Sequence, residues 1–223
     1  MTTTEPVKGP PWEVLAEHVG RRTAGFQHAL FDPNHPRRSA AVAQLAQLRR
    51  SDAADLADAA TWNVVFEGLP EELMGSGDEP SRSERALQAA LVLLAVHVQS
   101  STEPRHVPRR RLGLAVGQLA RDLDGEKYAD GSVARRFHAM SRATSWPGRL
   151  NHLRGLVQLM RAHSVPLDYA DLARDLYFIQ DPAGLRRTRL RWGRDFHRIT
   201  QSRNGSEPGT TPTTTTIDET KEY

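Results

Sequence analysis

The sequence predicts an all-α protein of about eight to nine helices in a compact, bundle-like arrangement. Apolar residues recur at helical spacing along most of the chain, and no segment shows the alternation typical of a strand. Hydrophobic residues make up 38% of the chain and aromatic residues only 6%, which suits a core of Leu, Ala and Val. With 223 residues the chain can form one or two units, each burying its own core.

The first part of the chain divides into helices at clusters of proline and glycine. A Thr-, Pro- and Gly-rich arm, residues 1–11, is expected to be disordered. Pro11 suits the first turn of a helix, and the following Gly, Pro and acidic residues of 67–80 predict a loop. A first group of helices, residues 12–67, therefore precedes this loop. Its three predicted helices run from Pro11 to the turn at Asp32, over 37–50 and over 53–66.

The helix predicted after the loop is the most apolar in the chain. Ser81 or Ser83 can act as its N-cap, and Glu84 stands three residues after Ser81, in the position of a capping box. The helix is predicted over 83–100, and between Ala86 and Val98 it is hydrophobic nearly all round. We therefore expect a central helix that is packed on several sides.

The remaining helices complete a second group over residues 81–203, so that 12–203 forms the folded domain. Ser132 and Asp168 are predicted N-caps, and Pro147 is predicted to open a helix. The Thr-rich tail, residues 204–223, is of low complexity and is expected to be disordered. The helices predicted in this group after the apolar one run over about 112–123, 133–144, 147–161, 169–179 and 183–203.

Charge is distributed unevenly along the chain. The net charge is only +3, but residues 105–198 hold 19 basic against 9 acidic residues, and the remainder holds 11 against 18. This asymmetry indicates a polyanionic partner for the later half. Of the 30 basic residues 27 are arginine, a bias that a GC-rich genome alone would also produce. Whatever its origin, arginine can fork onto phosphate and stack on bases.

The last predicted helix has the clearest pattern. Arg187, Arg191, Arg194 and Arg198 recur on one face, and Asp195 is the only acid within reach of them along this helix. Uncompensated like charges repel one another, so the stripe predicts a negative partner. The opposite face is apolar, and its members are predicted to be core residues: Leu185, Trp192, Phe196 and Ile199.

Composition and motifs argue against several other classes. There is no cysteine, which excludes disulfides and thiolate zinc sites, and no apolar run is long enough to cross a membrane. The start of the chain lacks the pattern of a signal peptide, so a cytoplasmic protein is expected. No phosphate-binding loop, nucleophile elbow or paired metal-ligating histidines occur. We therefore predict a protein that is not an enzyme and needs no metal or other cofactor.

Several segments, taken in order, resemble one known family. They closely resemble the CasB family, the small subunit of the type I-E CRISPR Cascade surveillance complex. The resemblance covers roughly residues 12–203. The segments that carry it are Ala-Gln-Leu-Arg-Arg at 46–50, Ser-Val-Ala-Arg-Arg-Phe at 132–137, Leu-Arg-Gly-Leu-Val-Gln-Leu-Met-Arg at 153–161, Leu-Asp-Tyr at 167–169, Leu-Ala-Arg-Asp-Leu at 172–176 and Arg-Trp-Gly-Arg-Asp-Phe at 191–196.

The resemblance implies a non-catalytic subunit of antiviral defence. Its expected partners are the other Cascade subunits with their guide RNA, a second copy of itself, and the target and displaced DNA strands. A basic face would hold these strands independently of sequence and so stabilise the R-loop. Charge reversal at Arg187 and Arg191 is expected to weaken DNA binding without unfolding the protein. The residues predicted to contact nucleic acid are Arg49, Arg50, Arg135, Arg142, Arg154, Arg187, Arg191 and Arg194.

Two other interpretations of the sequence remain open. Residues 167–198 could form a helix-turn-helix, with a basic second helix that enters a DNA groove in a sequence-specific regulator. A purely structural adaptor, whose arginine excess reflects genome composition, is the third possibility. The helix-turn-helix regulator would bind one DNA sequence, and the structural adaptor would show no salt-dependent binding of DNA.

Overall fold

The computed structural model describes residues 9–203, with side chains described up to residue 198. This part of the chain is all-α, as predicted. Most of the predicted arm 1–11 and all of the predicted tail 204–223 lie outside the described residues. The elements within 9–203 are α1 (Pro11–Phe31), α2 (Arg38–Arg50), α3 (Ala59–Val65), the short 3-10 helix η1 (Glu71–Leu73), α4 (Arg82–His97), α5 (Leu112–Asp124), the short 3-10 helix η2 (Gly125–Lys127), α6 (Ser132–Arg142), α7 (Trp146–Ala162), α8 (Tyr169–Phe178) and α9 (Pro182–Arg203).

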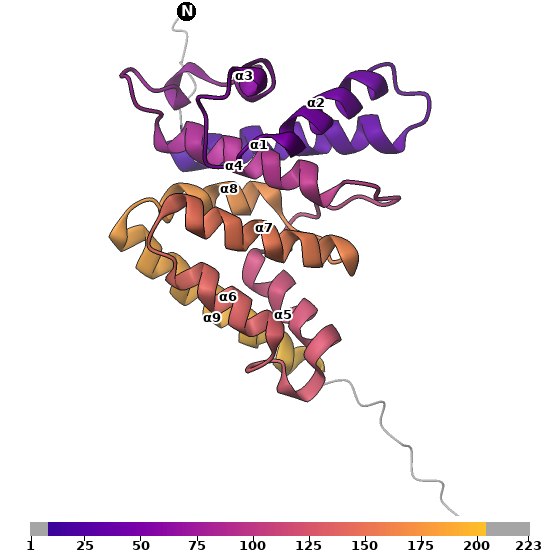
Figure 1. The fold of residues 1–223 in the computed structure, drawn as a ribbon, viewed down its shortest axis with the longest axis vertical. Coiled ribbons are helices and arrows are strands. Elements are labelled where there is room, and N and C mark those ends of the chain that lie inside the picture. The colour runs from indigo at the N-terminus through magenta and orange to yellow at the C-terminus, as the bar shows by residue number, and fades with distance from the viewer. Residues whose placement is uncertain (1–8, 204–223) are drawn as a thin grey trace, which may run out of the picture.

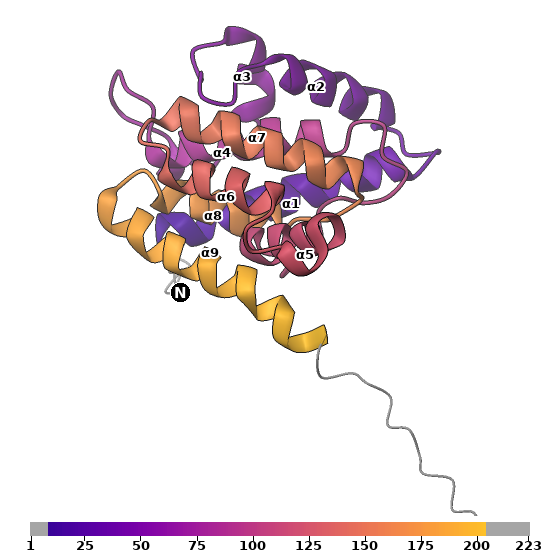
Figure 2. The ribbon, with the colours of Figure 1, turned by 60° about the horizontal axis from the view of Figure 1, so that its bottom comes forward.

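The helices form three groups along the longest axis of the molecule (Figure 1). Helices α1 to α4 lie at one end, α5, α6 and α9 lie at the other, and α7 and α8 lie between them. Helix α8 packs on α1 and α4, and α7 packs on α4 and α6. Helix α9 runs along one edge of the molecule, opposite α3 (Figure 2). No helix within the described residues is long and apolar enough to cross a membrane.

Helix α4 is the central helix, as its composition predicts. Every residue from Ala86 to His97 is buried, and α1, α2, α3, α7 and α8 all contact this helix. The predicted capping box is confirmed: the Glu84 N–H donates to Ser81 Oγ at 3.1 Å, and the Ser81 N–H donates to Glu84 Oε2 at 2.6 Å. The helix ends at His97 rather than at Ser100, which has a left-handed backbone with φ of 56°.

The predicted helix over 53–66 is wrong in its first half, because only Ala59–Val65 is helical. Three aspartates spaced by three residues explain the difference. The side chains of Asp52, Asp55 and Asp58 each accept a hydrogen bond from the backbone N–H two residues later, at 2.9 to 3.0 Å. These local bonds give the backbone an alternative to the helix. Asp58 thereby becomes the N-cap of α3.

The prediction of Ser132 as an N-cap is also wrong. The N-cap of α6 is Gly131, and the carboxylate that caps the helix comes from Asp124 at the end of α5. Asp124 Oδ2 accepts from the Val133 N–H at 3.1 Å, and its Oδ1 accepts from Ser132 Oγ at 3.2 Å. A carboxylate near a helix N-terminus satisfies free N–H groups and complements the helix dipole. One aspartate thus sets the turn between α5 and α6.

Helices α5 and α9 approach each other very closely. A Cβ atom at Gly113 would lie 2.5 Å from the Trp192 carbonyl oxygen, and one at Gly117 would lie 2.6 Å from that of Phe196. Only glycine at these two positions, one turn apart, leaves room for the α9 backbone. The sequence alone does not indicate the importance of these two glycines, because it depends on a helix about 80 residues away.

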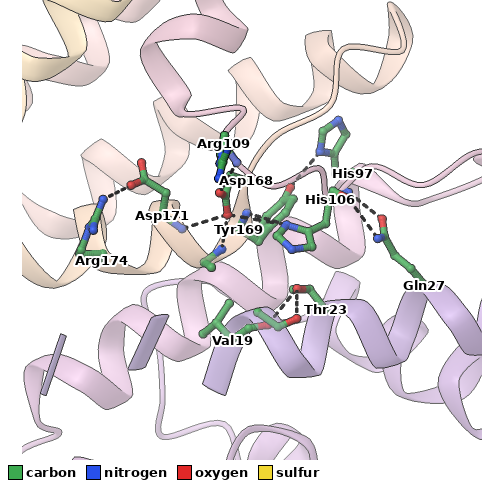
Figure 3. A network of polar contacts seen from close by, with 12 residues as sticks. Val19, Thr23, Gln27, His97, His106, Arg109, Asp168, Tyr169, Asp171 and Arg174 are labelled. Atoms are coloured by element: carbon green, nitrogen blue, oxygen red, sulfur yellow. Dashed lines mark hydrogen bonds and ion pairs between the residues drawn. The ribbon is translucent and has the colours of Figure 1, made fainter. Parts of the chain in front are cut away.

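A network of buried polar contacts joins α8 to the loop before α5 (Figure 3). Asp168 is the N-cap of α8, as predicted, and its Oδ1 accepts the N–H groups of the first turn at 3.0 and 3.1 Å. Its Oδ2 accepts from the Arg109 N–H at 2.7 Å. An isolated parallel bridge pairs His106 with Leu167 beside this cap. Local capping of α8 and long-range placement of the loop therefore depend on the same carboxylate.

His97 at the end of α4 completes this network. Its Nε2 donates to the Val165 carbonyl oxygen over 3.0 Å, and its Nδ1 lies 3.0 Å from the Tyr169 hydroxyl, which also contacts the Leu93 carbonyl oxygen at 3.2 Å. Burial, and secondarily the positive charge of Arg105, lowers the pKa of His97 to about 4. The imidazole is therefore neutral near pH 7, with its proton on Nε2.

The depressed pKa of His97 predicts a pH-dependent stability. In the unfolded chain His97 takes up a proton near pH 6.5, whereas in the folded state it does so only near pH 4. Acidification through this window therefore favours unfolding. The contribution of His97 to the free energy of unfolding is fully present above pH 6.5, and up to about 3 kcal/mol of it is lost by pH 4. Urea denaturation of the wild type and the variant His97→Gln across this range measures the effect.

The free energy of unfolding of His97→Gln should depend less on pH than that of the wild type, although the variant is the less stable protein at pH 7. The matched control is His163→Gln at an exposed position, which should retain the pH dependence of the wild type. Parallel curves for the wild type and His97→Gln would contradict the prediction.

Candidate nucleic-acid interface

Five of the eight arginines predicted to contact nucleic acid are exposed, and three are half-buried. The half-buried residues are Arg49, Arg154 and Arg191. The exposed residues are Arg50, Arg135, Arg142, Arg187 and Arg194.

Helix α6 presents Arg135 and Arg142 on its outer face, as its periodicity predicts. Val133, Phe137 and Met140 are buried on the inner face. Arg135 also donates from Nη1 to the carbonyl oxygen of Asp130, at 2.8 Å, in the turn that precedes the helix. This contact is to a neutral group, and the positive charge of Arg135 also acts on the carboxylate of Asp124, which caps the same helix.

Arg154 of α7 lies beside two arginines, Arg49 and Arg50, at the end of α2. Its Nη2 donates to the Arg49 carbonyl oxygen at 3.1 Å, so Arg154 lies beside Arg49 and Arg50 in the last turn of α2. A cation at this place satisfies a free carbonyl and complements the negative end of the helix dipole. The structure thus brings together residues that the sequence placed in two separate groups, more than 100 positions apart.

Helix α9 has a mixed outer face. Arg187 and Arg194 are exposed, together with Arg186 and with Leu190, which is 56% exposed. Trp192 and Phe196 are buried, and their rings lie 6.1 and 5.7 Å from that of Phe137 on α6.

The prediction that Trp192 and Phe196 belong to the core is confirmed, and Leu185 packs against the core as well. The predicted inward position of Ile199 lies outside the residues whose side chains are described.

Arg191 is different, because it forms ion pairs with buried aspartates of α8. It pairs with Asp175, which is 1% exposed, and lies 3.7 Å from Asp171. Asp175 also accepts a 2.6 Å hydrogen bond from Trp192 Nε1. Burial lowers the pKa of Arg191 and the charge of Asp171 opposes that shift; the guanidinium stays protonated at neutral pH. The sequence pattern reveals only acidic residues within the same helix, and therefore does not reveal these partners on α8.

A third buried aspartate, Asp195, joins α9 to α5. Its Oδ2 lies 3.4 Å from Arg111 Nε, just before α5, and its Oδ1 lies 3.5 Å from Arg198 Nη1. Asp195 is 2% exposed. Part of the basic stripe therefore neutralises the carboxylates that hold α9 in place. The face free to meet a polyanion consists of the residues outside these pairs, above all Arg187 and Arg194.

The chain matches a known protein family over most of its length. The family model for the CRISPR-associated protein Cse2 matches residues 44–197, a stretch that contains all eight predicted arginines. The chain belongs to the Cse2 family. Residues 44–197 also include α8 and most of α9, the two helices that the helix-turn-helix interpretation required.

Solved structures support membership of the Cse2 family. CasB from Thermobifida fusca aligns with a TM-score of 0.65 and 29% identity over 82% of this chain and 98% of its own. CasB from M. ruber aligns with a TM-score of 0.58 and 25% identity over 82% and 97%. A chain of a CRISPR RNA-guided surveillance complex aligns with a TM-score of 0.58 and 23% identity over 88% and 100%. None of the curated proteins matches the chain. The resemblance to CasB stated from the sequence is confirmed.

The ion pairs of Arg191 predict a structural role that Arg187 does not share. The substitution Arg191→Ala leaves the carboxylate of Asp175 buried without its cation, which should lower the free energy of unfolding by about 3 kcal/mol or more. The matched substitution Arg187→Ala, four residues earlier on the exposed face, should change it by less than about 0.5 kcal/mol. Urea denaturation measures both, and equal losses would contradict the assignment.

Proposed function

We propose that this Cse2-family chain is a non-catalytic subunit of an RNA-guided Cascade complex in antiviral defence. In this role it binds DNA strands independently of sequence through its exposed arginines and so stabilises the R-loop. The observation that carries the proposal is the exposed set on α6 and α9, where Arg135, Arg142, Arg187 and Arg194 remain outside the ion pairs with buried aspartates.

The physics of strand exchange explains how such a face acts. The RNA–DNA heteroduplex that forms is about as stable as the DNA duplex that it replaces, so contacts to strand backbones can tip the balance. Arginine suits these contacts, because its guanidinium forks onto phosphate oxygens and stays charged. Phosphate contacts carry no sequence information, which agrees with a face built from charges rather than from a recognition helix.

The proposed contacts differ in their availability. Arg50, Arg142, Arg187 and Arg194 are exposed, and Arg135 is exposed but bonded to the Asp130 carbonyl oxygen. Arg49 and Arg154 form a second patch with Arg50. Arg191 would contribute charge but little movement, because it is paired with Asp175. The other Cascade subunits with their guide RNA and a second copy of this chain are the proposed partners. The cytoplasmic location stays a prediction.

Reversing two exposed charges on α9 tests the proposal. The double variant Arg187→Glu and Arg194→Glu should bind DNA at least tenfold more weakly at low salt, because two phosphate contacts become repulsive. The magnitude of the slope of log K against log salt concentration should fall by about 1.4 to 1.8, since each of the two phosphate contacts contributes about 0.7 to 0.9. Fluorescence anisotropy with labelled single and double strands, over a range of salt, gives both quantities.

The control is a double variant with the same change of charge at the start of α2, Arg37→Glu and Arg38→Glu. Both residues are exposed, and α2 belongs to the helix group at the other end of the molecule from α9 (Figure 1). The control should bind DNA almost as the parent does. A folded α9 variant with unchanged affinity would overturn the proposed site. Preference for one duplex sequence over a random pool would instead favour the helix-turn-helix regulator.

A further inference from the structure

A hollow of about 380 Å³ lies where α1 begins, α8 ends and α9 starts. It is apolar on its walls and basic at its rim. Its size is at the lower end of the range for small-molecule sites, about 300 to 1,000 Å³, which suits one flat ring system. The residues that line it are Trp12, Phe178, Gly184, Arg187, Thr188 and Arg191.

The two aromatic residues of the hollow are not part of the hydrophobic core. The Trp12 and Phe178 rings lie 5.3 Å apart at an angle of 45°, and both side chains are only half-buried. Neither belongs to the buried core, in contrast to Trp192 and Phe196. Their rings lie 6.2 and 5.5 Å from the ring of Tyr177, which packs against the core, so this contact holds both rings in place while part of each stays exposed to the hollow.

The charges around the hollow favour an anionic ligand. Arg187 is exposed at the rim, and Arg191 is held in the wall by its pair with Asp175. The acidic side chain nearest to Arg187 along the chain is Asp181. It is already engaged, because it pairs with Arg82 at 3.0 Å and accepts the Gly184 N–H at 2.8 Å. The positive charge of Arg187 also acts on Asp181, but the Arg187 side chain is exposed and can contact a phosphate as well.

We propose that the hollow is a stacking site for one unpaired base of single-stranded DNA. The base would lie against Trp12 and Phe178, and the phosphates beside it would contact Arg187 and Arg194. These two arginines are seven residues apart, about 10 Å along the helix, so both can contact phosphates of one strand. Stacking on aromatic rings is tolerant of base identity. The inference rests on the proposed function and adds a preference for unpaired over paired strands.

The test compares strands with and without bases. The full-length protein is titrated against a 12-nucleotide oligothymidylate, against the same backbone with abasic sites throughout, and against a 12-base-pair duplex. The wild type should bind oligothymidylate about tenfold more tightly than the abasic strand, because stacking contributes about that factor per base. Trp12→Ala should lose this difference while its affinity for the abasic strand and the duplex is unchanged. Trp12→Phe, which keeps a ring, should retain part of it.

The matched control is Trp62→Ala on α3, a tryptophan that is 48% exposed on the opposite side of the molecule (Figure 2). This variant should keep the full preference for oligothymidylate. Equal affinity of the wild type for the two single strands, or a preference that survives Trp12→Ala, would overturn the stacking site alone. If the wild type bound none of the three ligands, the proposed DNA-binding function would fail with it.

Discussion

The all-round burial of α4 is the constraint on which the rest of the structure depends. A helix whose residues are apolar on every side cannot lie on a surface, since each exposed apolar side chain would lose about 1.5 to 3 kcal/mol of transfer free energy. Helices must therefore cover it on all sides, and α1, α2, α3, α7 and α8 do so. The remaining helices, α5, α6 and α9, have no room against α4 and form a second group that α7 and α8 connect to the first.

The buried polar contacts are explained by the same constraint. Where α4 ends inside the protein, His97 must satisfy groups that water cannot reach, and it does so with Val165 and Tyr169. Around α9, Asp175 and Asp195 are buried and need cations, which Arg191 and Arg111 provide. A buried carboxylate without such a partner would be strongly destabilising. Some arginines of the basic stripe therefore stabilise the fold, and a count of charges overstates the surface available for the proposed DNA binding.

The sequence predicts the structural features that depend on residues close together along the chain. The capping box of Ser81 and Glu84, the cap at Asp168 and the inner faces of α4, α6 and α9 all follow from local spacing, and the structure has them. The helix predicted to begin at Ala53 begins at Ala59 instead. Three aspartates spaced by three residues accept hydrogen bonds from backbone N–H groups two residues later. The sequence could not reveal contacts between distant segments.

Such distant contacts decide which arginines are free. Arg191 and Asp175 face each other only after α8 and α9 fold against each other, and Arg154 meets the end of α2 across more than 100 residues. The candidate site could therefore be predicted as a set of residue types and helix faces, but not as a set of free charges.

The turn between α8 and α9 shows how packing and the proposed stacking site are linked. A Cβ atom at Gly184 would lie 2.1 Å from the Phe178 carbonyl oxygen, so only glycine lets α9 start this close to the end of α8. That close start is what places Arg187 beside Phe178 and Trp12. A larger residue at position 184 would have to push α9 away and would separate the basic rim from the aromatic wall. The glycine required by the fold thus also builds the hollow, although it offers no side chain to a ligand.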